Sequence, residues 1–114
     1  MNKVLLVTGG GRGIGAATAR LAARRGWDVA INYAARADAA EEVAKEVRAA
    51  GARAITVRAH VADEGEVLAM FARIDAELGR LHGLVNNAGV VDVTARLDEM
   101  SVARWRRMFD INVI

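Results

Sequence analysis

The sequence predicts an α/β fold in which helices cover both faces of a doubly wound parallel sheet. Short apolar runs alternate with segments that have helical periodicity, and glycines separate them in a chain without proline. The 114 residues, 54% of them apolar, are enough for one domain. Because crossovers between parallel strands are right-handed, few topologies remain, and the strand order 3-2-1-4 is favoured.

The first half of the chain contains two predicted strands, residues 3–8 and 28–33, each followed by a helix. The first helix carries an apolar stripe that we expect to face the sheet: Ile14, Ala17, Thr18, Leu21 and Ala22. The second helix carries a similar stripe: Ala40, Val43, Ala44 and Val47. The spacing of Asp38 and Glu41 predicts a capping box with Asp38 as the cap, and Gly51 follows where the helix ends.

The second half repeats this pattern with predicted strands at residues 53–58 and 83–88. Asp63 and Glu66 predict the start of the helix between them. In the order 3-2-1-4 the fourth strand lies at an edge. A last helix, capped by Ser101, is expected to bury Val102, Trp105, Phe109 and Asn112. Because the sequence ends within this helical pattern, we expect residues 1–114 to be the N-terminal part of a single longer domain, truncated after strand 4, with no second domain.

A glycine-rich turn joins the first strand to the first helix. Glycine allows a tight turn and a close approach of pyrophosphate, and the helix N-terminus offers free N–H groups to phosphates. The position between a strand and a helix distinguishes this motif from an ordinary glycine turn. The residues predicted to bind a dinucleotide here are Thr8, Gly9, Gly11, Arg12, Gly13, Ile14 and Gly15.

A second motif, Asn86-Asn87-Ala88-Gly89, ends the fourth predicted strand. Ligands of open α/β sheets bind beyond the carboxyl ends of the strands where the strand order reverses, here between strands 1 and 4. With the TGxxxGxG spacing of the glycine-rich turn, the whole chain resembles the short-chain dehydrogenase/reductase family, in particular its ketoacyl-reductase-like and glucose-dehydrogenase-like members. The resemblance implies a Rossmann fold, hydride transfer between a nicotinamide cofactor and a small alcohol or carbonyl substrate, and a homotetramer or homodimer. It also implies that Asn87, Ala88 and Gly89 line the nicotinamide ribose.

The end of the second strand indicates which nicotinamide cofactor is bound. NAD binding usually needs a carboxylate about 20 residues beyond the glycine turn, and residues 32–36 contain none. Arg12 and Arg36 can instead attract a 2′-phosphate, so NADP is favoured over NAD. Asn32 and Tyr33 are predicted to belong to the same cofactor site.

His60 and Val61 follow the third strand, where the family usually has an aspartate and an apolar residue that contact the adenine. Val61 fits that pattern and His60 departs from it, so His60 is either an adenine contact or a partly exposed loop residue. The other histidine, His82, is expected on the surface.

The resemblance implies a catalytic role for Asn112, which would hold a water molecule in a proton relay. It also implies a serine and a YxxxK motif, and neither can be placed: Tyr33 is the only tyrosine and lies on the adenosine side, and Ser101 is interpreted as a helix cap. We therefore expect this chain alone to be inactive. A non-enzymatic dinucleotide-binding or interaction domain is the alternative.

Composition narrows the remaining classes. A net charge of +2 with interleaved signs and 4% aromatic residues argues against nucleic-acid binding. The absence of cysteine, with two histidines, argues against a metal site. No apolar run approaches a membrane span and no secretory signal is recognisable, so we expect a cytoplasmic protein without a membrane partner.

Overall fold

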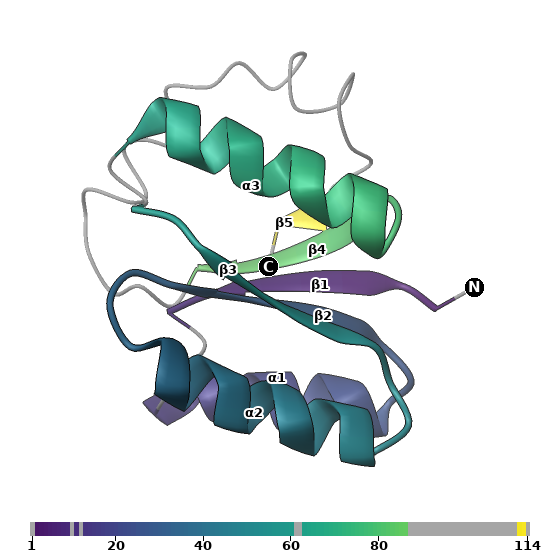
Figure 1. Ribbon diagram of the computed structural model, residues 1–114. Coiled ribbons are helices and arrows are strands. Elements are labelled where there is room, and N and C mark those ends of the chain that lie inside the picture. Colours follow the sequence, from purple (N-terminus) through teal and green to yellow (C-terminus); the bar gives the residue numbers. More distant parts are fainter. Residues whose placement is uncertain (1, 10, 12, 61–62, 87–111, 114) are drawn as a thin grey trace.

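Strands and helices alternate along the chain in the computed structural model, which describes residues 2–9, 11, 13–60, 63–86 and 112–113. The elements are β1 (Val4–Thr8), α1 (Gly13–Arg24), β2 (Asp28–Tyr33), α2 (Ala37–Ala49), β3 (Ala54–Arg58), α3 (Glu64–Glu77), β4 (Leu81–Asn86) and β5 (Asn112–Val113). The strands pair in parallel in the order β3-β2-β1-β4-β5. Helices α1 and α2 cover one face of the sheet and α3 covers the other (Figure 1). The predicted doubly wound sheet and its order 3-2-1-4 are confirmed.

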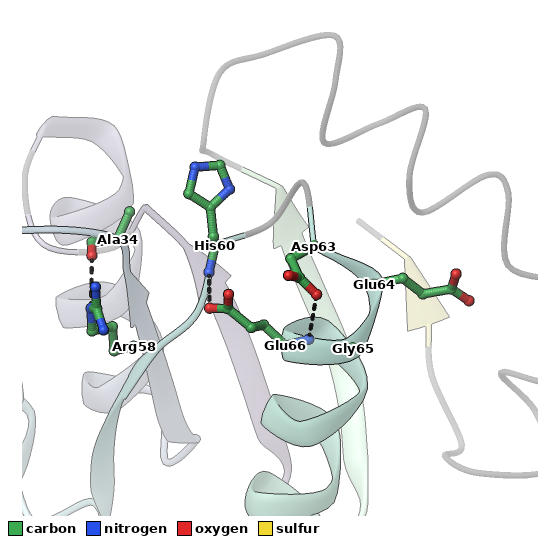
Figure 2. A pocket seen from close by; sticks show the side chains of 7 residues that line it. All are labelled: Ala34, Arg58, His60, Asp63, Glu64, Gly65 and Glu66. Carbon is green, nitrogen blue, oxygen red and sulfur yellow. Dashed lines mark hydrogen bonds between the residues drawn. The ribbon is translucent and has the colours of Figure 1, made fainter.

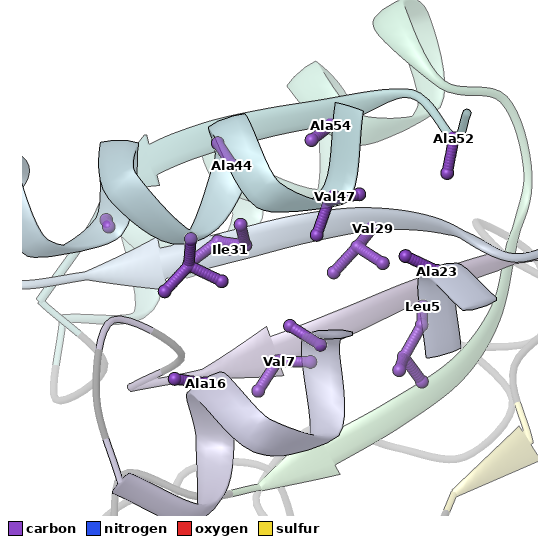
Figure 3. Packing of buried hydrophobic residues seen from close by; sticks show 13 residues of the cluster. Leu5, Val7, Ala16, Ala23, Val29, Ile31, Ala44, Val47, Ala52 and Ala54 are labelled. Carbon is purple, nitrogen blue, oxygen red and sulfur yellow. The ribbon is translucent and has the colours of Figure 1, made fainter. Parts of the chain in front are cut away.

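The sheet is buried on both faces, which explains why its central strands are continuous apolar runs. All five residues of β1 are buried. Under α3, the largest buried side chains are those of Phe71, Leu6 and Ile74. Under α1 and α2, the core combines Val and Ile of the strands with alanines of the helices (Figure 3).

Helix α1 packs on the sheet through a different face from the one that the sequence predicts. Ile14 is 77% exposed and Leu21 is 47% exposed, and Ala17 is exposed as well. The predicted stripe of Ile14, Ala17, Thr18, Leu21 and Ala22 is therefore wrong except at Ala22, which is partly buried against the core. The buried residues of α1 are Gly15, Ala16, Ala19 and Ala23. Small residues allow the helix backbone to lie close to the Val and Ile side chains of β1 and β2, as the last glycine of such turns does.

The two predicted helix caps have different outcomes. Asp63 caps α3, and its Oδ1 accepts a hydrogen bond of 3.0 Å from the backbone N–H of Glu66, as predicted. Asp38 lies inside the first turn of α2, and the cap position belongs to Arg36, whose side chain makes no capping bond within the described residues. The Asp38 prediction is therefore wrong, because this carboxylate pairs with the Arg36 guanidinium instead.

Strand β5 occupies a place where a helix was predicted. Asn112–Val113 pairs in parallel with Gly83 and Leu84 of β4. Asn112 is thus not on the buried stripe of a helix, and β4 is not an open edge along this stretch. The likeness to a helix came from side-chain spacing alone, whereas main-chain pairing satisfies the N–H and C=O groups that an edge strand exposes. The rest of the predicted helix, residues 101–109, lies outside the described residues.

His82 is a structural residue and not the surface residue that was expected. Its side chain is half-buried, and its Nδ1 accepts a hydrogen bond of 3.1 Å from the backbone N–H of Val4. The pairing of β1 with β4 shifts register between Val4 and Leu5. The imidazole therefore satisfies a main-chain donor at the point where the ladder is irregular.

Candidate functional site

The carboxyl ends of β1 to β4 lie along one edge of the sheet and bring the predicted motifs together. Thr8 at the end of β1 is opposite Asn86 at the end of β4. Tyr33 at the end of β2 is opposite Arg58 at the end of β3. The glycine-rich turn thus lies between the basic end of β2 and the polar end of β4, where a sheet of this order binds ligands.

Glycine is required in the turn for two separate reasons. Gly9 and Gly13 both have φ of 62°, in the left-handed region that other residues adopt at a cost. Gly11 lies against the start of α2, and a Cβ there would come within 3.2 Å of the backbone nitrogen of Ala40. The turn leads directly into α1 at Gly13, so the free N–H groups of the first helical turn are at the sheet edge.

Two buried polar side chains attach this turn to the sheet. The Thr8 hydroxyl, 2% exposed, donates a hydrogen bond of 3.4 Å to the carbonyl oxygen of Val85 in β4. On the other side, Oδ1 of Asn32 accepts a bond of 3.4 Å from the N–H of Gly9. Asn32 was predicted as a cofactor residue, but its amide is 2% exposed and is bonded to the backbone.

The segment between β2 and α2 presents Arg36 to solvent. Arg36 donates two hydrogen bonds of 3.1 Å to the carboxylate of Asp38. These bonds hold the pKa of Asp38 below its usual value and raise that of Arg36. Because both side chains are exposed, this pair contributes little to stability.

Besides the predicted Arg12 and Arg36, a third arginine belongs to this region. Arg58 ends β3 and is opposite Tyr33 at the end of β2. Its Nε donates a hydrogen bond of 3.3 Å to the carbonyl oxygen of Ala34. Arg58 is not among the residues that the sequence predicts for the cofactor site. The signal was available, because Arg58 ends β3 and neighbouring parallel strands end at the same edge.

A pocket of about 700 Å³ opens between the end of β3 and the start of α3, and its lining includes Ala34, Arg58 and His60 (Figure 2). The backbone N–H of His60 donates a hydrogen bond of 2.9 Å to Oε1 of Glu66, while its ring extends away from that carboxylate. The main chain at His60 is thus fixed by α3, and both His60 and Arg58 line the pocket.

The structure tests the position of only some predicted site residues. Arg12, Val61, Asn87, Ala88 and Gly89 lie outside the described residues. Tyr33 is half-buried and packs on the core under α1 and α2. Asn112 pairs with Gly83, which is itself opposite Leu5 of β1. Gly83 is three positions before Asn86, so the main chain at Asn112 lies about 10 Å from the carboxyl edge.

Comparison with known proteins agrees with this geometry. Residues 3–114 match the sequence profile described as short chain dehydrogenase. The chain belongs to this family. The expected family and the Rossmann fold are therefore confirmed.

Several relatives within the short-chain dehydrogenases are similar to the chain. It is 48% identical over 111 residues to cis-4-hydroxycyclohexanecarboxylate dehydrogenase of Sinomonas cyclohexanicum, covering 97% of this chain and 44% of the relative. It is 40% identical over 113 residues to 3-oxoacyl-(acyl-carrier-protein) reductase FabG of Staphylococcus aureus, covering 99% and 46%. A double mutant of a Serratia marcescens short-chain dehydrogenase/reductase is 38% identical with a TM-score of 0.73, covering 93% and 43%.

The chain therefore spans less than half the length of these short-chain dehydrogenases. Within the described residues, none of the helices is both long enough and apolar enough to cross a membrane. The same part of the chain holds no group of three histidine or acidic residues suited to a metal ion.

Proposed function

We propose that this chain is the cofactor-binding part of an NADP-dependent short-chain dehydrogenase/reductase that transfers hydride between NADP(H) and an alcohol or carbonyl substrate. The observation that carries the proposal is the arrangement of residues at the carboxyl edge of the sheet. A turn with two glycines in the left-handed region leads into α1, and arginines at the ends of β2 and β3 flank it.

The residues present fit the pyrophosphate of a dinucleotide. Gly9 and Gly13 fold the turn, and apart from the chain neighbours of Gly13 and the backbone of α1, no described atom lies within 4 Å of where a Gly13 Cβ would be. Gly13 is the first residue of α1, and negative charge is stabilised by the helix dipole at that end.

The basic residues support the choice of NADP. Arg36 and Arg58 lie on adjacent strand ends, and guanidinium groups bind phosphate through paired hydrogen bonds. The carboxylate of Asp38 is already engaged by Arg36, whereas Arg58 lines a pocket together with the carboxylates of Asp63, Glu64 and Glu66. We propose that Arg36 and Arg58, with Arg12 in the turn, select the 2′-phosphate.

Cofactor titration tests this selection. In the full-length protein, Arg36→Ala should weaken NADPH binding by about tenfold and NADH binding by less than about twofold, because only NADPH carries the phosphate. Binding is measured by the change in nicotinamide fluorescence. Arg24→Ala is the matched control, since Arg24 is exposed at the far end of α1 and should leave both affinities unchanged. Equal affinity of the unmutated protein for NADPH and NADH would contradict the choice of NADP.

The catalytic step is proposed to need residues of the full-length protein, because a serine and a YxxxK motif would supply the substrate-holding group and the proton donor. When bound, the cofactor supplies or accepts the hydride. The described residues bind and orient that cofactor. A reading frame that continues into YxxxK supports an enzyme, whereas a stable product without it supports the non-enzymatic alternative.

Asn112 is proposed, on the resemblance alone, to take part in the proton relay. In the full-length protein, Asn112→Leu should lower kcat at least about tenfold with an unchanged Kd for NADPH, because a broken relay slows proton transfer and leaves the cofactor contacts intact. Steady-state kinetics together with cofactor titration measure the two effects. An unchanged kcat would show that Asn112 does not take part in the proton relay.

A further inference from the structure

Asn32 connects three segments at the carboxyl edge of the sheet, namely β2, the turn after β1 and the end of β3. It lies in β2 and is 2% exposed. Its Nδ2 donates to the carbonyl oxygens of Val57 and Ala59 at 3.3 and 3.1 Å. Its Oδ1 accepts from the N–H of Gly9 at 3.4 Å.

The two outer partners lie on opposite sides of β2. Gly9 follows β1 and Ala59 follows β3, and β2 separates these strands in the sheet. No ladder of main-chain hydrogen bonds can join strands that are not neighbours, so a side chain from the middle strand must make the connection. A primary amide suits this position, because it offers two donors to the carbonyls and one acceptor to the N–H.

We propose that Asn32 is a positioning residue that fixes the start of the glycine-rich turn against the end of β3 and so places the N–H groups that receive the cofactor's pyrophosphate. The inference rests on the proposed function. The amide itself is buried and its hydrogens are engaged within the sheet, so Asn32 acts through Gly9 and not by touching the cofactor. The hydrogen bond of Gly9 falls at a residue with φ of 62°, where the turn leaves the sheet.

Asn32→Leu removes the amide while keeping a similar side-chain volume. Affinity for NADPH should fall by about tenfold, because a turn without a fixed start must be ordered on binding. Affinity for adenosine 2′-monophosphate should change by less than about twofold, since this probe lacks the pyrophosphate and depends on the arginines. If the substitution only lowered the stability of the protein, the affinities for the two ligands would fall to a similar degree. Asn32→Ser, whose shorter side chain cannot reach Gly9, gives the same separation if the leucine variant does not fold.

Asp28→Asn is the matched control, because Asp28 is a buried polar residue of the same strand at its opposite end. This variant should unfold at a lower denaturant concentration and bind NADPH with unchanged affinity. If both variants lose NADPH affinity in proportion to their loss of stability, or if the Asn32 variants bind NADPH normally, the positioning role is overturned. If the unmutated protein binds adenosine 2′-monophosphate but not NADPH, or neither of them, the proposed function fails and the inference with it.

Discussion

Arg53→Met is expected to lower the free energy of unfolding by about 3 kcal/mol at pH 7, because it leaves a buried carboxylate without its cation. The side chain of Asp28 is 1% exposed and lies 2.9 Å from Nε of Arg53. Its other oxygen accepts from the backbone N–H of Arg53 at 2.8 Å and from Nδ2 of Asn2 at 3.1 Å. Arg53 also donates to the carbonyl oxygen of Leu78 at 2.9 Å, so one guanidinium joins β2, β3 and the end of α3.

The pH dependence follows from the pKa of Asp28. Burial raises this pKa, but hydrogen bonds from the Arg53 backbone, Asn2 and the Arg53 side chain outweigh it and hold the pKa below 3.8. A lowered carboxyl pKa contributes stability that is fully present above the unfolded value and is lost as the pH falls through the folded value. The difference between the two proteins should therefore be largest at neutral pH and shrink below pH 3.8.

Urea unfolding at neutral and acidic pH measures this difference. Lys45→Met is the control, because Lys45 pairs with Glu42 across an exposed face of α2, and its loss should cost less than about 0.5 kcal/mol. Equal effects of the two substitutions, or a penalty for Arg53→Met that is independent of pH, would show that Asp28 does not depend on Arg53.

The order of elements was predictable because each strand and helix has its own sequence pattern. β1 and β2 are apolar runs bounded by glycine or polar residues, and α3 begins with an aspartate three positions before a glutamate. The buried face of α1 was not predictable from hydrophobicity. Its sheet-facing residues are glycine and alanines, whereas its larger apolar side chains, Ile14 and Leu21, face outward. Close packing of the α1 backbone on the sheet selects small side chains, although larger side chains would bury more apolar area.

The candidate site was predictable as far as its residues belong to local motifs. The glycine-rich turn could be read from spacing, and its context between β1 and α1 is as expected. The place of Arg58 beside the end of β2 followed from the predicted strand order. The hydrogen bonds of Asn32 depend instead on which backbone atoms its buried side chain reaches, and a linear pattern does not contain that information. Asn32 was interpreted as a cofactor contact because it ends the second strand, but its partners come from the turn after β1 and from β3.

The same limit applies to the charged residues. Asp28 begins β2, and its pairing with Arg53, 25 positions away, could not be foreseen. Asp38 fits a capping pattern in sequence, but in the structure it binds the guanidinium two residues earlier. In both cases the partner of the carboxylate is an arginine. Because the long side chain of arginine can reach several neighbours, the sequence does not indicate which one it binds.

Gly13→Val is expected to weaken NADPH binding by about a hundredfold, a loss of about 2.7 kcal/mol in binding free energy. Two effects act together at this position. Gly13 has φ of 62°, and a β-branched residue is a steric outlier in that region. A side chain there would also add bulk at the first residue of α1, where the pyrophosphate is proposed to bind.

Gly51→Val is the control that separates the steric effect on the pyrophosphate from the strain in the backbone. Gly51 has φ of 95°, and apart from its chain neighbours no described atom lies within 4 Å of where its Cβ would be. It follows α2 at the opposite end of the sheet from the glycine-rich turn. Both variants should lose stability by about 1–2 kcal/mol, because both force a side chain into the left-handed region. Only Gly13→Val should lose NADPH affinity, as measured by nicotinamide fluorescence. Normal NADPH affinity of the folded Gly13 variant would mean that the cofactor's pyrophosphate does not lie at the start of α1, since a bound phosphate and a valine side chain cannot occupy the same space.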